Sequence, residues 1–412
     1  MTHVINTNQL LAEGLLNEAQ AKEIARRSRD TMLALVVNIV LTAGIIAASL
    51  GFVFWIADAF GVALLGAAFL AVGLAILMKA DALYRLLGHA GTLIGAGMLF
   101  VGGAIELLDK YPDIADITLI PVGAAIAAAA GWAYHKAPKT LRFTTGSFVL
   151  AGVGLHLTGA TIALNGVSGL PIAAFYLYAA GLIAAAGAFV NVRAVTALAI
   201  VPFAQVFDTG TAYFHAAYVF YSPEPTLTIL QMGALVAIGA WAMTKLPDRM
   251  GRHAGILAIM AAVVGNLAFL VASLWGDEVG ASFYRADAPN YADFDDWSAY
   301  RAAYDLWEEQ FIQISEHVFS VVWAALLIAG AWLAAATHRR GLFNASVTFL
   351  AIHAYTQVFE TFADEPMVYA LGGLAAIPAA WGLWRLNQKI FADPQSIAKP
   401  RGVEKGARLS RG

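Results

Sequence analysis

The sequence predicts an all-α protein: a polytopic transmembrane helical bundle of about twelve spans, built from tandem helical hairpins with internal repeats. Three observations lead to this fold class: few charged residues, a series of long apolar runs, and an uneven distribution of basic residues between those runs. Hydrophobic residues make up 60% of the 412 residues and charged residues only 13%. Because a soluble domain carries about 25% charged residues, this composition indicates that lipid is the main solvent.

The apolar runs are long enough to cross the hydrocarbon core, which takes roughly 20 residues. Such segments must be helical, because every backbone N–H and C=O has to be satisfied within the segment. We expect spans at 32–56, 62–79, 86–108, 117–135, 143–164, 170–190, 194–215, 226–244, 254–275, 314–336, 341–362 and 367–385.

These spans divide the chain into five parts. We expect a cytoplasmic helical head (1–30), spans one to nine (31–275), a periplasmic acidic and aromatic insert (276–312), spans ten to twelve (313–388) and a basic cytoplasmic tail (389–412). In the head, Asn17 can cap a helix, and Gln20 stands at the third position of a capping box.

The orientation follows from the basic residues. With the N-terminus in the cytoplasm, only Lys110, Arg285 and Arg301 of the 25 Lys and Arg residues fall outside. This asymmetry is what the positive-inside rule predicts. The sequence therefore favours a bacterial cytoplasmic (inner) membrane protein with both termini in the cytoplasm.

Short patterns recur along the chain. Three inward-running helices end in a tryptophan followed four residues later by a basic residue: WAYHK (132–136), WAMTK (241–245) and WGLWR (381–385). Tryptophan at the interface and a long basic side chain beyond it anchor a helix end. Outward-running helices are rich in small residues, which allow close helix contact in lipid.

The insert has a pattern of its own. Five aromatic residues recur at helical spacing: Trp297, Tyr300, Tyr304, Trp307 and Phe311. Acidic residues lie on the opposite face of the same stretch. This pattern predicts an amphipathic helix. The helix could lie in the outer membrane interface, or the insert could bind a protein partner.

Two further stretches are near copies of each other: VTALAIVPFAQVFDT (195–209) and VTFLAIHAYTQVFET (347–361). The acid near the end of each copy is Asp208 in the first and Glu360 in the second. An acid inside a span is costly and by default faces the bundle interior or a water-filled cavity. Near the outer boundary, however, an acid has an ordinary interfacial role, so both interpretations stay open.

Other polar residues could join these acids. On the second copy, His353 and Gln357 share a helix face with the acid, so histidine and carboxylate could relay protons or hold a cation. His156 lies mid-span in the fifth helix, where a lone histidine usually bonds a neighbouring helix. The candidate residues for a polar path are Asp208, Glu360, Gln205, Gln357, His353, His215, Glu106 and His156.

Several kinds of chemistry find no support in the sequence. There are no cysteines, which excludes disulfides, thiolate metal sites and a cysteine nucleophile. No phosphate-binding glycine loop, HExxH motif or nucleophile elbow is present, so no catalytic residue or metal site is predicted, and the sequence leaves any cofactor unknown. The expected partners are the lipid bilayer, a small solute or ion, and a protein at the insert, with no nucleic acid.

The head carries one resemblance. LLAEGLLNEAQAKEI (10–24), leading through a basic turn into the first span, resembles the start of bacterial multi-pass membrane proteins of the domain of unknown function 2157 type. The resemblance implies a short cytoplasmic helical pair followed by many small-residue-rich spans. It implies no activity.

Three functions are compatible with this pattern. The leading hypothesis is a transporter- or permease-like protein that moves an ion or small solute along a polar path lined by the two copied helices. The alternative is a non-transporting assembly factor, sensor or partner subunit. The third is a membrane enzyme that acts on a lipid-linked substrate.

Overall fold

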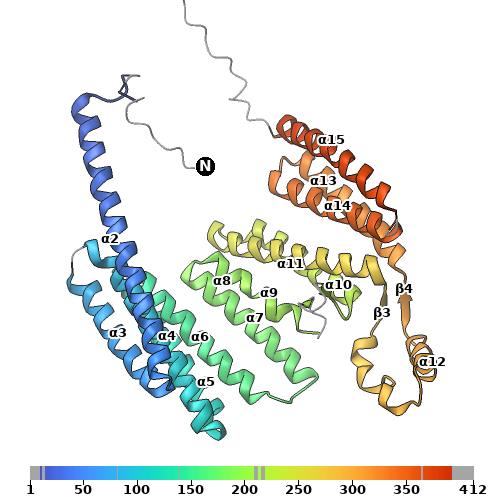
Figure 1. Cartoon of the computed structure of the whole chain (residues 1–412), viewed down its shortest axis with the longest axis horizontal. Coiled ribbons are helices and arrows are strands. Elements are labelled where there is room, and N and C mark those ends of the chain that lie inside the picture. The colour runs from blue at the N-terminus through green and yellow to red at the C-terminus, as the bar shows by residue number, and fades with distance from the viewer. Residues whose placement is uncertain are drawn as a thin grey trace, which may run out of the picture. The chain divides into compact units, whose positions relative to one another are not determined.

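The structure, a computed structural model, describes residues 10–11, 14–80, 82–138, 140–207, 212–214, 219–362 and 365–391. It confirms the all-α fold (Figure 1). The helices are α2 (Glu18–Ile56), α3 (Ala59–Lys79), η1 (Ala82–Tyr84), α4 (Arg85–Lys110), α5 (Pro112–Lys136), α6 (Arg142–Ala163), α7 (Leu170–Val190), α8 (Arg193–Leu198), α9 (Ile200–Ala204), α10 (Pro225–Lys245), α11 (Asp248–Trp275), η2 (Ala281–Asp287), η3 (Tyr291–Asp293), α12 (Trp297–Glu308), α13 (Glu316–Ala336), α14 (Arg340–Thr361) and α15 (Pro366–Ile390). The strands are β1 (Ala212–Phe214), β2 (Val219–Tyr221), β3 (Asp277–Val279) and β4 (Ile312–Ile314).

Ten helices in the described part of the chain are long and apolar enough to cross a membrane. This set fits a multi-pass membrane protein. The two expected spans outside the set are 194–215 and 341–362. The second of these is a helix of full span length, α14, with a less apolar composition than the ten.

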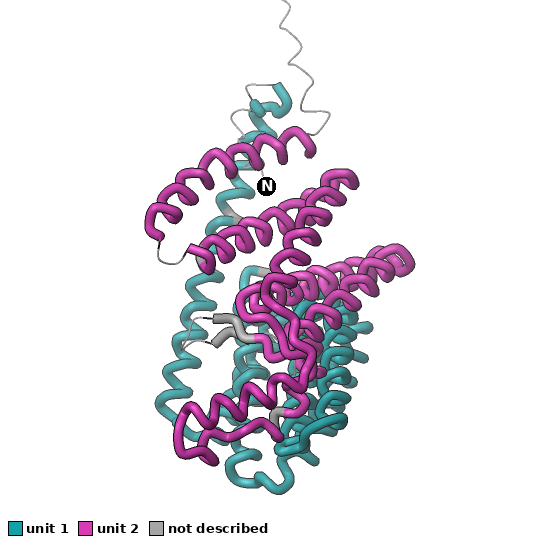
Figure 2. Tube along the Cα trace, turned by 90° about the vertical axis from the view of Figure 1, so that its right-hand side faces the viewer, with its two compact units in different colours: residues 1–199 teal, residues 200–412 magenta. Residues whose placement is uncertain are grey.

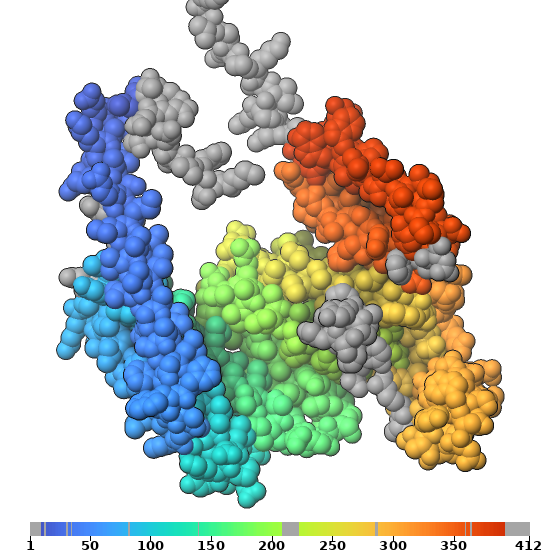
Figure 3. All heavy atoms as spheres, viewed as in Figure 1, coloured from blue at the N-terminus to red at the C-terminus, as the bar shows by residue number. Residues whose placement is uncertain are grey.

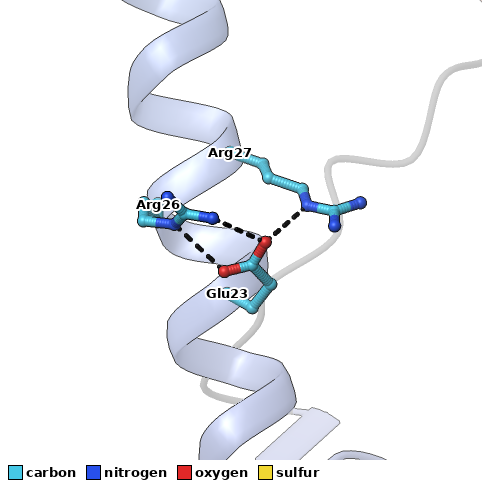
Figure 4. Close-up of polar contacts among 3 residues, drawn as sticks. All are labelled: Glu23, Arg26 and Arg27. Carbon is cyan, nitrogen blue, oxygen red and sulfur yellow. Dashed lines mark hydrogen bonds and ion pairs between the residues drawn. The ribbon is translucent and has the colours of Figure 1, made fainter.

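The chain forms two compact units, residues 1–199 and 200–412 (Figure 2). Unit 1 begins with α2, whose N-terminus has the predicted capping box: Asn17 accepts from the Gln20 N–H, and the Gln20 side chain accepts from the Asn17 N–H. One turn further on, Glu23 bonds both Arg26 and Arg27 (Figure 4). The helix then runs on to Ile56 without a break at residue 30, so the second helix of the predicted head is continuous with the first span.

The hairpins of unit 1 are held by backbone-to-backbone contact. A Cβ placed on Gly66 of α3 would lie 2.7 Å from the Gly95 carbonyl oxygen of α4, and a Cβ on Gly95 would lie 2.7 Å from the Gly66 oxygen. The same reciprocal contact, again at 2.7 Å, occurs 57 residues later, between Gly123 of α5 and Gly152 of α6 (66 to 123, 95 to 152). Any side chain at these points would separate the helices. The predicted close packing of small residues is therefore present.

The hairpins of unit 2 rely more on side-chain packing, although Gly239 of α10 also lies close to Ala254 and Ala258 of α11. Met232 of α10 and Ala261 of α11 form a buried cluster with Ile200 and Ala204 of α9. In the hairpin of α13 and α14, the Trp323 ring is buried against other side chains and is only 1% exposed.

The expected span at 194–215 is wrong as a single helix. The chain forms α8 and α9 with a break after Leu198, followed by turns and then by β1 and β2, which pair antiparallel. Pro202 supplies the physical reason. It has no N–H to donate to the Leu198 carbonyl, and its ring crowds that carbonyl. The second copy has Ala354 at the corresponding place, and α14 is continuous.

The insert forms a distinct lobe of unit 2 in the space-filling view (Figure 3). β3 pairs antiparallel with β4, and these strands join the lobe to α11 and α13 (Figure 1). The predicted amphipathic helix is α12, capped by Asp296. It ends at Glu308 and does not continue into the next span, because β4 intervenes.

Candidate functional site

Several of the predicted polar-path residues cannot be placed. Asp208 and His215 lie outside the described residues. Gln205 is half-buried in the turn that follows α9, and Glu360 is exposed in the last turn of α14. The path between the two copied acids therefore stays a prediction.

The second copy does present the expected polar stripe. His353 is only 7% exposed, and its ring meets the Trp323 ring edge-on at 4.8 Å between centroids. The Trp323 Nε1–H in turn donates to Asn266 Oδ1 of α11 at 2.8 Å. Among the described residues, His353 Nδ1 and Gln357 Nε2 are buried and have no hydrogen-bond partner. Buried polar groups are normally paired, so these two atoms are places where water or a solute could bind.

The other two candidates have structural partners in unit 1. Glu106 pairs with Lys110 on the same helix at 2.5 Å. His156 joins three helices: Nδ1 contacts the Ile120 carbonyl oxygen at 2.9 Å and Nε2 contacts the Tyr178 hydroxyl at 2.7 Å. A carbonyl can only accept, so Nδ1 carries the proton and a neutral ring accepts from Tyr178 at Nε2. These contacts favour the structural role that a lone buried histidine usually has.

A different group of residues encloses a cavity of about 500 Å³ in unit 2. It lies where α10 begins and α11 ends, and the insert closes one side. Its wall contains three carboxylates, from Asp277, Glu278 and Glu308, together with the aromatic side chains of Trp275, Tyr304 and Trp307. No Lys or Arg is among the described residues that line it.

Two buried acids hold the wall of this cavity in place. Asp277, only 4% exposed, accepts a hydrogen bond of 2.8 Å from the backbone N–H of Thr226, in the first turn of α10. Glu224, which is fully buried, accepts from the backbone N–H groups of Gly280 (2.9 Å) and Ser282 (2.8 Å), where η2 begins. Each acid thus caps the helix start of the other segment, and the carboxylate charge also suits the positive end of the helix dipole.

The end of α11 brings the two segments together. Gly276 adopts a positive φ of 73°, and a Cβ there would lie 2.7 Å from the Ile314 carbonyl oxygen of β4. Only glycine satisfies both conditions without strain. The chain can therefore turn at once from the helix into β3, which places Asp277 and Glu278 at the cavity.

The carboxylates of the cavity retain protons more tightly than usual. Burial raises the pKa of Asp277 to about 6, although its hydrogen bonding to Thr226 opposes the change and the charge of Glu224 adds to it. Burial also raises the pKa of Glu278, and the charge of Glu308 adds to that effect. For Glu308, burial raises the pKa and the Arg301 guanidinium opposes it. Perturbed groups in one cleft are a mark of a functional site.

The chemistry of the cavity wall therefore suits a positively charged ligand. Carboxylates attract positive charge, and the faces of tryptophan and tyrosine stabilise an ammonium or guanidinium group through cation–π interaction. The hydroxyl oxygen of Ser282, which lies in the wall, is itself buried and has no hydrogen-bond partner among the described residues. Within the described residues, no group of three or more His, Asp and Glu side chains is arranged to hold a metal ion. The arrangement suits an organic cation better than a bare metal ion.

Sequence reasoning missed this site. The aromatic spacing of the insert predicted α12, but not that Tyr304 and Trp307 would face carboxylates from another segment. The position of Glu224, directly before Pro225, would have suggested a cap for α10, but its side chain makes no cap hydrogen bond there and accepts from Gly280 and Ser282 instead. A comparison with protein-family models, curated proteins and solved structures finds no match.

Proposed function

We propose that this chain is a transporter- or permease-like protein of a bacterial cytoplasmic membrane, with both termini in the cytoplasm, and that it takes up a cationic organic solute at the acidic cavity. One observation carries the proposal: Asp277, Glu278 and Glu308 share a cavity of about 500 Å³ with aromatic side chains. Pockets for small molecules commonly enclose about 300–1,000 Å³.

The raised pKa values supply a mechanism for loading and release. Near neutral pH, Asp277 is mostly ionised, because burial raises its pKa only to about 6. A bound cation would lower the raised pKa values of the carboxylates back toward their ordinary range, and a proton arriving at Asp277 would weaken cation binding. Solute and proton thus compete for the same carboxylates.

The route onward through the membrane is proposed to follow the two copied segments. Two buried atoms on α14, His353 Nδ1 and Gln357 Nε2, support this part of the proposal, since neither has a hydrogen-bond partner among the described residues. The recurrence of the glycine contact after 57 residues, from Gly66–Gly95 to Gly123–Gly152, supports tandem repeated hairpins as the scaffold. About twelve spans remain the proposed total.

Uptake of radiolabelled tetramethylammonium into proteoliposomes tests the proposal. An excess of neopentyl alcohol, a neutral molecule of similar shape, is the control competitor. We expect saturable uptake that unlabelled tetramethylammonium inhibits and the alcohol does not, and loss of the uptake in an Asp277→Asn, Glu308→Gln double variant. Uptake that the double variant retains would contradict the role of the cavity, and the absence of any saturable uptake would contradict transport.

A second function is favoured by a specific observation on the insert. Three of its apolar side chains are largely exposed: Trp297 at 61%, Leu306 at 65% and Ile312 at 72%. Exposed apolar residues of this kind suit a partner protein or the membrane interface. A partner-subunit role predicts that a photo-crosslinking amino acid at Leu306 gives one protein adduct of defined mass in cells, whereas an interfacial role predicts lipid adducts.

A further inference from the structure

Three helices of unit 2 bring polar side chains together inside their apolar parts. The Ser320 hydroxyl of α13 donates to the Ser273 carbonyl oxygen of α11 at 3.4 Å. One turn further along α13, the Trp323 Nε1–H donates to Asn266 Oδ1 of α11, and the Trp323 ring contacts the His353 ring of α14. Ser273 lies in the last turn of α11, where the acidic cavity begins. This polar row therefore extends from the cavity end of α11 to His353.

Two members of the polar row already have all their partners. Asn266 accepts from Trp323 at Oδ1, and its Nδ2–H donates to the Ala262 carbonyl oxygen at 2.7 Å. Trp323 has a single N–H, which that bond uses, and its ring stacks on Phe269 with 6.2 Å between centroids. These contacts hold both side chains in place, so they form the wall beside His353 and leave the histidine to bind something else.

His353 differs in this respect from the structural histidine of unit 1. His156 uses both ring nitrogens for bonds to neighbouring helices. His353 is only 7% exposed, and within the described residues its Nδ1 and the Nε2 of Gln357, one turn further, are buried without a partner. At 1.5 Å per residue, His353 lies about 20 Å from the start of α14 and about 12 Å from its end. An ionisable group at such a depth is costly, and it marks a functional site by default.

Among the described residues, no carboxylate is placed to compensate a charge on His353. In α11, α13, α14 and α15, the charged and titratable side chains other than tyrosine all lie near a helix end: Asp248, Arg249, Arg252, His253, Glu316, His317, Arg340, Glu360, Arg385 and Lys389. The tyrosines, Tyr355 and Tyr369, carry no charge at neutral pH. Glu360 shares the helix face of His353 but lies about 10 Å further along α14 and is exposed. A proton on His353 therefore adds an uncompensated positive charge, which repels a cation that enters the same space.

We propose that His353 is the proton-binding residue of the membrane path, and that a proton on its ring and a cationic solute exclude each other. The inference rests on the proposed transport function and assigns its coupling ion. In the neutral ring one nitrogen carries a lone pair, which takes a proton from water that enters beside Gln357; the proton returns to water when the solute arrives. Histidine suits this role because its charge changes between about pH 5 and 8. Each cation that moves inward is then exchanged for a proton that moves outward.

Steady-state accumulation in proteoliposomes tests this coupling. Vesicles that are one pH unit more acidic inside than outside, with the membrane potential clamped at zero, receive radiolabelled tetramethylammonium. For one-to-one exchange with protons, the wild type should concentrate the label about tenfold inside. His353→Gln should carry the label only to equal concentrations on the two sides. A transporter that is merely slower reaches the wild-type ratio later, so the ratio separates lost coupling from impaired folding. His317→Gln, the same substitution at an exposed histidine of unit 2, is the control and should match the wild type.

Proton binding itself is measured by ¹⁵N NMR of histidine-labelled full-length protein in bilayers. The signal that His353→Gln lacks should change from the neutral to the protonated form as pH falls from about 8 to 5, and saturating tetramethylammonium should reverse the change.

The inference is overturned if this ring stays neutral over that range or does not respond to the cation. It is also overturned if His353→Gln concentrates the label as the wild type does, because Asp277 alone would then carry the proton. Saturable uptake by the wild type that no pH gradient drives would overturn the inference and leave transport intact. No saturable uptake by the wild type would contradict transport and the inference together.

Discussion

The hairpin of α5 and α6 and the hairpin of α10 and α11 begin and end in similar sequences but differ in their helix–helix contacts. In both, the first helix starts with a proline and ends in Trp-x-x-x-Lys. The first pair meets backbone to backbone at Gly123 and Gly152, whereas the second pair has a looser glycine contact at Gly239 and a buried side-chain cluster with Met232 and Ala261. Where α10 begins and α11 ends, the second pair also has Glu224 and Asp277, whose hydrogen bonds hold the wall of the acidic cavity.

This difference indicates that the glycine contact serves the packing of the scaffold, whereas the end of the second hairpin forms the candidate site. In the middle of a hairpin, glycine contact excludes polar side chains and supplies close packing only. At the hairpin end, outside the apolar part, acids can cap helices and still face a cavity. Substitutions in the first region should therefore change stability alone, and substitutions of the cavity carboxylates should change ligand binding with little loss of stability.

The largest effect on stability is expected at the contact between Gly123 and Gly152. Gly152→Leu should destabilise the protein by about 3 kcal/mol or more, since the side chain would force two helix backbones apart. Thermal unfolding in detergent measures this. Gly154→Leu is the matched control, because a Cβ at Gly154 meets no atom within 4 Å. Equal melting of the two variants would show that the hairpins do not meet at Gly152.

A smaller effect is expected at the buried cap. Glu224→Ala should cost about 2 kcal/mol, because it leaves the N–H groups of Gly280 and Ser282 without an acceptor. Hydrogen exchange should speed up in η2 while α5 stays protected. The exposed Glu309→Ala serves as control. Unchanged exchange in η2 would mean that Glu224 does not anchor the insert.

The smallest effect on stability concerns pH. The pKa of Asp277 is raised from 3.8 to about 6 in the folded protein. Between these values the folded state holds the proton more tightly than the unfolded chain, so the contribution of Asp277 to stability falls as pH rises from about 4 to 6. Above that window the contribution is constant.

Asp277→Asn should remove this pH dependence. It should raise the melting temperature by a few degrees at neutral pH, because the neutral amide does not carry the buried charge. The amide oxygen of asparagine can still accept from Thr226, so the fold should be retained. Melting curves at several pH values measure the change. An identical pH dependence in wild type and variant would contradict the raised pKa.

The helices could be predicted from the sequence because length and composition determine them. Asn17 and Gln20 form the predicted capping box, and the aromatic spacing predicted α12. The near copies show where such reasoning fails. Their similarity predicted two equivalent helices, yet Pro202 breaks the first copy at Leu198 and Ala354 keeps the second continuous.

The acidic cavity could not be predicted, because its parts are distant in sequence. Glu224 is bonded to residues 280 and 282, more than fifty positions away, and Asp277 is bonded to Thr226. Sequence periodicity reports which residues share one helix face. It carries no information on which loops meet at a hairpin end, so the convergence of Asp277 and Glu308 became visible only in three dimensions.

Calorimetric titration of the full-length protein with tetramethylammonium tests the central claim most directly. The account predicts saturable binding at pH 7.5 that weakens as pH falls below about 6, where Asp277 takes up a proton. Asp277→Asn should reduce the affinity at least tenfold, and neopentyl alcohol should not bind to the wild type. Equal binding of the alcohol, or affinity that is the same in wild type and Asp277→Asn at both pH values, would contradict a cation site in the acidic cavity.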